Sequence, residues 1–135
     1  MDGLIIEQTK STPKVVLDPQ NAKLSIEGQS YPENAFKFYE PIFSWLDKYL
    51  DQLQQDVVLE IYFHMPYINT SSSKCMMMLF EKLEEAHEAG KKVTIRWYYD
   101  QENEIALECA EEFKEDLGLP FEIIPLNDEG MSNGK

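Results

Sequence analysis

Four consecutive hydroxyl-bearing residues, Thr70 to Ser73, are the side chains whose type and position best suit a chemical modification. They follow a segment with the alternation of a β-strand, residues 57–64, and they precede an apolar stripe with helical spacing. The first turn of a helix presents N–H groups without helical partners, together with the positive end of the helix dipole. A phosphate attached there is electrostatically favoured. We therefore expect this hinge to carry a phosphorylation site.

Thr70 is the expected acceptor, because it lies closest to the strand end and is well placed as a helix cap. A phosphate adds about −1.5 to −2 charges and three acceptor oxygens. The N–H groups two and three residues further on are expected to donate to it, and a lysine four residues on shares its helical side. A plain helix cap without modification is the alternative interpretation. The expected phosphosite surround is Asn69, Ser71, Ser72, Ser73 and Lys74.

A possible partner surface starts at the same hinge. Helical spacing places Thr70, Lys74, Met77 and Glu81 on one side of the predicted helix. Methionine is a flexible apolar anchor for a partner groove. A partner fitted to a neutral hydroxyl would have to desolvate a phosphate dianion or be rejected. The sequence therefore predicts a phosphorylation switch in protein binding.

Catalytic and metal-binding patterns are weak in this sequence. His64 and His87 have no ligand-like neighbours, and there is no CxxC, HExxH, glycine-rich phosphate loop or G-x-S-x-G motif. The many carboxylates show no metal-ligand spacing. Cys75 and Cys109 lie far apart in predicted helices and are expected to be buried in a reducing compartment. We therefore expect a protein that is not an enzyme and that has no metal and no cofactor.

The net charge of −13 argues against two classes of partner. A chain this acidic repels nucleic acid phosphate and anionic lipid, so neither nucleic acid nor a membrane is an expected partner. No segment approaches the ~20 consecutive apolar residues that a membrane span needs. The first residues lack the basic and apolar regions of a signal peptide. We therefore expect a cytoplasmic protein.

The order of expected elements indicates one α/β domain over residues 1–126. Short strands are predicted at residues 4–8, 14–18, 23–27, 57–64, 93–99 and 121–126. Helices are expected to start at Ser30, which forms a capping box with Glu33, near Ser72, and at Asp100. Repeated strand–helix–strand units require parallel neighbours, so the sheet is expected to be mixed. The polar segment 127–135 is predicted to be a disordered tail.

The two central strands alternate between apolar and polar residues. Since a strand covered on both faces would be apolar on both, helices are expected mainly on one face of the sheet. The other face would present Glu60, Tyr62, Arg96 and Tyr98 to solvent or to a partner, with Glu60 and Arg96 as a cross-strand pair. A small enzyme or ligand-binding domain that uses this face is a further alternative.

Apolar stripes predict which side of each helix faces the core. In the first helix, Pro41 lies inside the stripe, and Trp45 and Tyr49 lie outside it as a possible contact surface. The expected stripe of the first helix is Phe36, Tyr39, Phe43, Leu46, Leu50 and Leu53. The residues expected to face inward from the third helix are Ile105, Ala106, Cys109, Ala110, Phe113 and Leu117.

The hinge is similar to the phosphorylation loop of STAS domains, the anti-sigma factor antagonist fold. In that family an Asp-Ser-Ser-Gly segment ends a central strand, and its first serine is phosphorylated. Thr70 matches that serine and Asn69 stands in the Asp position, whereas Ser72 replaces the glycine. The resemblance implies a STAS-like fold. It leaves open the alternative that the protein is an anti-sigma factor antagonist, which would bind an anti-sigma kinase.

A closer resemblance, over residues 9–126, is to the SiaC family of bacterial regulatory phosphoproteins. It implies that Thr70 is phosphorylated by a SiaB-like Ser/Thr protein kinase and dephosphorylated by a SiaA-like PP2C-type phosphatase. It also implies that the unmodified form binds and stimulates a SiaD-like GGDEF diguanylate cyclase, which controls cyclic-di-GMP signalling and biofilm formation. The matching segments are Ser11-Thr12-Pro13, Ser30-Tyr31-Pro32-Glu33-Asn34, Asn69-Thr70-Ser71-Ser72, Leu83-Glu84-Glu85-Ala86-His87, Arg96-Trp97-Tyr98-Tyr99-Asp100 and Ala110-Glu111-Glu112-Phe113.

Overall fold

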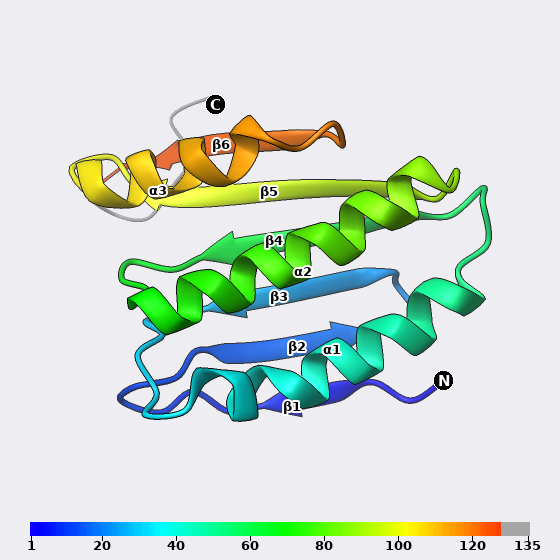
Figure 1. The fold of residues 1–135 in the computed structure, drawn as a ribbon, viewed down its shortest axis with the longest axis horizontal. Coiled ribbons are helices and arrows are strands. Elements are labelled where there is room, and N and C mark those ends of the chain that lie inside the picture. Colours follow the sequence, from blue (N-terminus) through cyan, green and yellow to red (C-terminus); the bar gives the residue numbers. More distant parts are fainter. Residues whose placement is uncertain (128–135) are drawn as a thin grey trace.

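The computed structural model describes residues 1–127, which form one α/β unit with a single six-stranded sheet (Figure 1). The predicted tail therefore lies outside the described residues, except for Asn127. The elements are β1 (Leu4–Ile6), β2 (Lys14–Asp18), β3 (Lys23–Glu27), α1 (Ala35–Gln52), β4 (Val58–His64), α2 (Thr70–Glu88), β5 (Lys92–Asp100), α3 (Glu104–Glu115) and β6 (Phe121–Leu126).

The sheet is mixed, as the sequence predicts, and its strands lie in chain order from β1 to β6. The pairs β1–β2 and β2–β3 are antiparallel, and β3 to β6 are parallel neighbours. The β2–β3 turn passes through Ala22, whose φ of 53° lies in the left-handed region. Each parallel connection then carries one helix.

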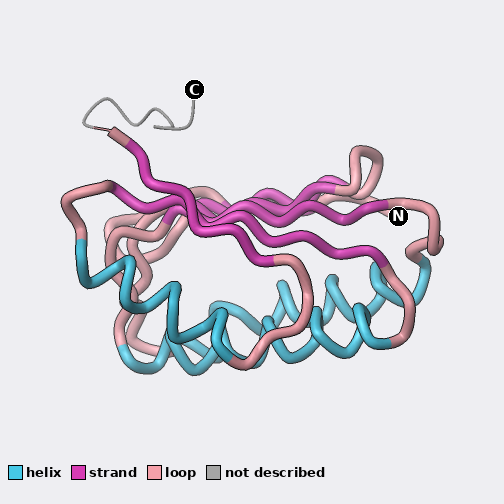
Figure 2. Tube along the Cα trace, turned by 90° about the horizontal axis from the view of Figure 1, so that it is seen from above, coloured by secondary structure: helices cyan, strands magenta, loops and turns pink. Residues whose placement is uncertain are grey.

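All three helices cover the same face of the sheet, which confirms the expectation drawn from strand alternation (Figure 2). The parallel strands are added in one direction, from β3 to β6. Crossovers between parallel strands are right-handed almost without exception. Because all three crossovers have the same hand and lead in the same direction along the sheet, their helices lie on the same face. The opposite face is therefore not covered by helices.

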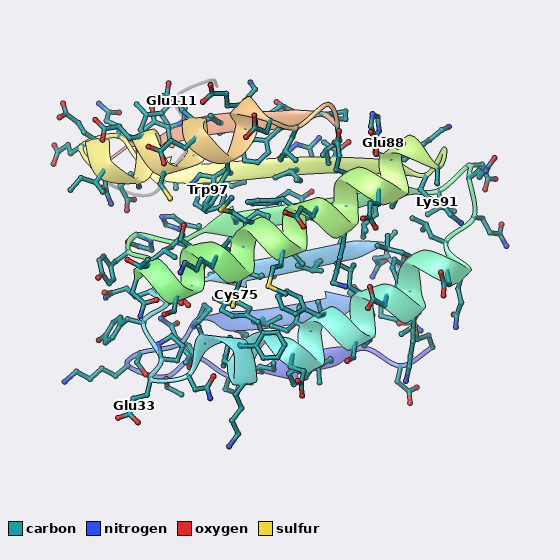
Figure 3. The ribbon with its side chains drawn as sticks, in the orientation of Figure 1. Glu33, Cys75, Glu88, Lys91, Trp97 and Glu111 are labelled. Carbon is teal, nitrogen blue, oxygen red and sulfur yellow. The ribbon has the colours of Figure 1, made fainter. Side chains whose placement is uncertain are left out.

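The core lies between the helices and the sheet. Leu59, Ile61 and Phe63 of β4 are buried, while the residues between them in sequence point to the open face. The Trp97 ring stacks on Phe63 at 5.1 Å between centroids. Figure 3 shows Trp97 of β5 and Cys75 of α2 in this layer, and both are buried. The hinge between β4 and α2 is thus anchored at both ends in elements that pack into the core.

The first helix starts later than the sequence predicts. Asn34, not Ser30, is its cap, and the Asn34 Oδ1 accepts a hydrogen bond from the Lys37 N–H at 3.1 Å. Ser30 is instead paired with Ile68 in an isolated parallel bridge. Its backbone is therefore held by another segment and cannot open a helix.

Two aromatic residues of α1 differ from the expected pattern. Phe36 is 51% exposed, although it was expected in the core stripe, and Tyr49 is buried, although it was expected on a contact surface. The other stripe residues are buried as predicted. The centre of the buried arc is thus rotated toward Ile42 and Tyr49. Pro41 lies inside the helix, as the sequence indicates.

The third helix also starts later than expected, because Asn103 rather than Asp100 caps it. Its Oδ1 accepts from the Ala106 N–H at 3.0 Å. Asp100 is the last residue of β5, and its carboxylate lies 3.4 Å from His64 Nε2. Ile105 is 78% exposed, contrary to expectation, since the buried arc of α3 is the narrower set Ala106, Ala110 and Phe113.

The helices of the described structure do not meet the requirements for a membrane span. Within residues 1–127, none of the helices combines the length and the apolar composition that a bilayer crossing requires.

Candidate functional site

The hinge after β4 opens directly into α2, and its cap is Asn69. The Asn69 Oδ1 accepts from the Ser72 N–H at 2.9 Å, and its main-chain carbonyl accepts from the Ser73 N–H at 2.9 Å. The expectation that Thr70 is the cap is therefore wrong, because Thr70 is the first helical residue. The N–H groups of Ser72 and Ser73, which were expected to donate to a phosphate, donate to Asn69 instead. The first N–H groups of the helix, those of Thr70 and Ser71, remain for an anion.

Replacing Asn69 by alanine is expected to destabilise the protein by about 1 kcal/mol, because the Ser72 N–H loses its acceptor. Urea denaturation followed by circular dichroism measures this loss. Asn69→Asp is the matched control, since aspartate caps as well as asparagine. Equal losses for the alanine and aspartate variants would show that the cap contributes nothing.

The four hydroxyl residues separate into exposed and buried side chains. Thr70 and Ser71 are exposed and Ser73 is partly exposed, whereas Ser72 is 0% exposed. The Ser72 Oγ accepts a hydrogen bond from the Ser30 Oγ at 2.8 Å, and the same Ser30 oxygen lies 2.6 Å from the Tyr39 hydroxyl. Ser72, which was expected in the phosphosite surround, is therefore a buried residue whose hydroxyl is not accessible. The exposure of Thr70 meets the first requirement for modification.

The buried chain of three hydroxyls links the hinge helix to α1. Burial raises the pKa of the Tyr39 hydroxyl well above its usual value, although its hydrogen bond with Ser30 acts in the opposite direction. Tyr39 therefore stays a neutral hydrogen-bonding group. The chain fixes the inner side of the first turn of α2 while Thr70 points outward from the same turn.

Ser30 also holds the hinge through its backbone. Its N–H donates to the Tyr67 carbonyl and its carbonyl accepts from the Asn69 N–H, both at 2.9 Å. The next N–H, of Tyr31, donates to the Ser11 carbonyl at 2.8 Å. Three segments far apart in sequence thus meet around the turn that carries Thr70. The sequence gives no local signal for this role of Ser30, because its partners lie 37 to 42 residues away.

One exposed side of α2 runs from the hinge along the helix. Thr70, Lys74, Met77 and Glu81, which helical spacing places on one side of α2, are all exposed. Tyr67, which is 51% exposed, lies at the start of this surface. Its ring meets Tyr31 edge-on at 5.9 Å. The pair is an aromatic contact beside the hinge that sequence analysis did not single out.

Tyr62 and Tyr98 lie on the opposite, open face of the sheet. Their rings stack at 6.3 Å, and the Tyr62 hydroxyl donates to Glu60 at 2.7 Å. Arg96 lies 3.2 Å from Glu60 and 3.5 Å from Glu122, so the predicted Glu60–Arg96 pair is confirmed. The structure therefore does not bring these tyrosines together with Met77 and Glu81. They belong to a separate surface.

The stability difference between the natural protein and a Glu60→Gln variant is expected to narrow at acidic pH. The hydrogen bond from Tyr62 and the Arg96 guanidinium lower the pKa of Glu60. A lowered folded-state pKa adds stability near neutral pH, and this is lost as pH falls through that pKa. Because the pair is partly exposed, the effect at neutral pH is below about 1 kcal/mol. Urea denaturation at several values between about pH 7 and about pH 3 measures this difference in the free energy of unfolding. Glu111→Gln is the control variant. If the stability curves of the natural protein and Glu60→Gln stayed parallel over this pH range, the prediction would be contradicted.

The cysteines and acidic residues offer no alternative chemistry within the described residues. Burial raises the pKa of the Cys75 thiol, and burial together with Glu112 raises the pKa of Cys109 to about 11. Both thiols are therefore protonated at neutral pH and poor nucleophiles. Across residues 1–127, no group of three or more His, Cys, Asp and Glu side chains is arranged to hold a metal ion.

Comparison with known proteins gives the family. The sequence model described as "SiaC family regulatory phosphoprotein" matches residues 6–126. The chain belongs to the SiaC family. It is therefore a member of a family of regulatory proteins, in agreement with the expectation of a regulator rather than an enzyme.

Two proteins of Pseudomonas aeruginosa match nearly the whole chain. An uncharacterized protein of strain UCBPP-PA14 is 43% identical over 123 residues, which are 91% of this chain and 96% of that protein. The structure of SiaC of Pseudomonas aeruginosa matches with a TM-score of 0.86 and 41% identity, covering 93% of this chain and 99% of that one.

A second solved structure shows a SiaC protein with a partner. It is the crystal structure of diguanylate cyclase SiaD in complex with its activator SiaC from Pseudomonas aeruginosa. That SiaC chain matches with a TM-score of 0.85 and 43% identity, covering 90% of this chain and 98% of the other. A regulatory role exercised through protein binding is thus known for a close relative of this SiaC-family chain.

Proposed function

We propose that this SiaC-family chain activates a diguanylate cyclase when Thr70 is unmodified and releases it when Thr70 is phosphorylated. The observation that carries the proposal is the exposed Thr70 in the first turn of α2, on a hinge held by Asn69 and Ser30. The complex of the Pseudomonas aeruginosa relative with its cyclase supports this choice of partner.

The chemistry of the turn supports Thr70 as the acceptor. The helix N-terminus stabilises a negative group by typically ~0.3–1 kcal/mol. Lys74, exposed and four residues on, lies on the same helical side and offsets part of the added charge. The phosphate is therefore compatible with the fold, and its effect falls on the surface that a partner meets. A SiaB-like kinase would add it, and a SiaA-like PP2C-type phosphatase would remove it.

Incubation with the cognate kinase and ATP, followed by peptide mass spectrometry, tests the acceptor. Phosphate is expected on the peptide containing Thr70, and Thr70→Ala is expected to abolish it. Ser71→Ala is the matched control, because Ser71 is the adjacent exposed hydroxyl and its removal should leave modification intact. Full modification of the Thr70→Ala protein would refute the assignment.

A further inference from the structure

A groove of about 430 Å³ is lined by residues of α2, of α3 and of the two positions that follow α3. Figure 1 shows both helices on the same face of the sheet. Along α2 the groove extends from Ser73 to Glu85. At a rise of 1.5 Å per residue this is about 18 Å, the length of about twelve residues of a helix. Its lining residues are Ser73, Met77, Phe80, Glu81, Glu84, Glu85, Glu112, Phe113, Asp116 and Leu117.

The floor of this groove is apolar and is part of the hydrophobic core. The rings of Phe80 and Phe113 meet at 5.0 Å, and both belong to the hydrophobic core. Met77, which is 52% exposed, and the partly buried Leu117 extend the apolar surface toward solvent. The floor can therefore bury apolar side chains of a ligand without a rearrangement of the core.

The rim of the groove is acidic on both walls. Five carboxylates line it, and no lysine or arginine is among the lining residues. The Glu84 carboxylate accepts from the Gly118 and Leu119 N–H groups at 3.0 Å. The other four carboxylates make no hydrogen bond or ion pair within the described residues; they belong to Glu81, Glu85, Glu112 and Asp116. The acidic groups are not arranged to hold a metal ion. The rim thus suits positive charges spread along an elongated ligand.

We propose that this groove docks a basic amphipathic helix presented by a protein partner. Its apolar side chains would lie on the Phe80–Phe113 floor, and its lysine and arginine side chains would face the two acidic walls. An amphipathic helix in an apolar groove is a recurring mode of peptide recognition. The charge excludes nucleic acid and disfavours a second copy of a chain with net charge −13.

Docking in this groove goes beyond the proposed function and can be tested apart from it. Thr70 precedes Ser73 by three residues and does not line the groove. A negative charge at Thr70 would leave unchanged or strengthen the attraction for a basic helix. The proposed function requires the same charge to weaken cyclase binding. Thr70→Asp therefore separates the two proposals by the sign of its effect.

A synthetic helix of about twelve residues, with leucine on one face and lysine on the other, is the probe for this site. Fluorescence anisotropy of the labelled peptide should show binding to the full chain, weakened about tenfold by the pair Glu112→Lys and Asp116→Lys. The matched control is Glu111→Lys with Glu115→Lys, two exposed residues of α3 that do not line the groove. Figure 3 shows Glu111 on α3. This control changes the net charge equally and should alter affinity less than about twofold.

Two further measurements separate docking from general charge attraction. A scrambled peptide of equal composition, without an apolar face, should bind at least about tenfold more weakly. Met77→Ala, at an exposed position of the floor, should weaken binding without any change of charge. Absence of peptide binding, equal loss in the two double variants, or equal binding of the scrambled peptide would overturn the proposal. So would light scattering that shows a dimer of the natural chain and a monomer of the variant with Glu112→Lys and Asp116→Lys, because the groove would then be a contact between two copies.

Discussion

Thr70→Asp is expected to weaken binding to the cognate diguanylate cyclase by about tenfold or more. A charge that a partner surface does not neutralise costs several kcal/mol when it is fully desolvated, and each 1.4 kcal/mol corresponds to a factor of ten. A single carboxylate at an exposed position can retain part of its bound water. We therefore expect a cost smaller than that of a fully desolvated charge, which corresponds to a loss of affinity of about tenfold or more. Isothermal titration with the purified cyclase measures the affinity, and cyclic-di-GMP synthesis should fall in parallel.

The controls for this prediction come from the same helical turn. Thr70→Ala removes the hydroxyl without adding charge and should bind the cyclase within about threefold of the natural protein. Ser71→Asp adds the same charge about 100° further around the helix. If only Thr70→Asp weakens binding, the partner contacts the Thr70 side of α2. Equal affinity of Thr70→Asp and Thr70→Ala would contradict the rejection of charge.

The strand pattern predicts β2, β3 and β6 with the bounds that the structure gives them. It also predicts the one-sided helical layer, because alternation along β4 and β5 is a local property that reports which face is covered. The family resemblance points to the same turn of α2 that the structure exposes. These features follow from residues close to one another in sequence.

The helix starts could not be predicted in the same way, because several capping residues compete at each one. Ser30 is a good cap by type, but its backbone is bound to the hinge and its hydroxyl to Tyr39 and Ser72. Asp100 is another, but it ends β5 beside His64. Only the tertiary contacts decide that Asn34 and Asn103 take these roles. The division of the hydroxyl run into exposed and buried members depends on the same long-range contacts.

Ser72→Asp is expected to have the largest effect on stability, a loss of about 3 kcal/mol or more in the free energy of unfolding. The side chain is 0% exposed, and a carboxylate there would be buried against two hydroxyl groups without a cation. Ser71→Asp, one residue earlier and exposed, should change stability by less than about 1 kcal/mol, because solvent and the helix dipole accommodate the charge. Urea denaturation compares the two variants.

Ser72→Ala keeps this prediction measurable if the aspartate variant does not fold. It should cost about 1–3 kcal/mol, since the buried Ser30 hydroxyl loses its acceptor at 2.8 Å. A Ser72→Asp protein as stable as the natural one would show that the hydroxyl chain is not closed to solvent. Ser72 would then be accessible to a kinase, and the argument that selects Thr70 over Ser72 by burial would fail. If Ser72→Asp loses stability and Ser71→Asp does not, a charge can be added only on the outward side of this turn without unfolding the protein. Thr70 lies on that side.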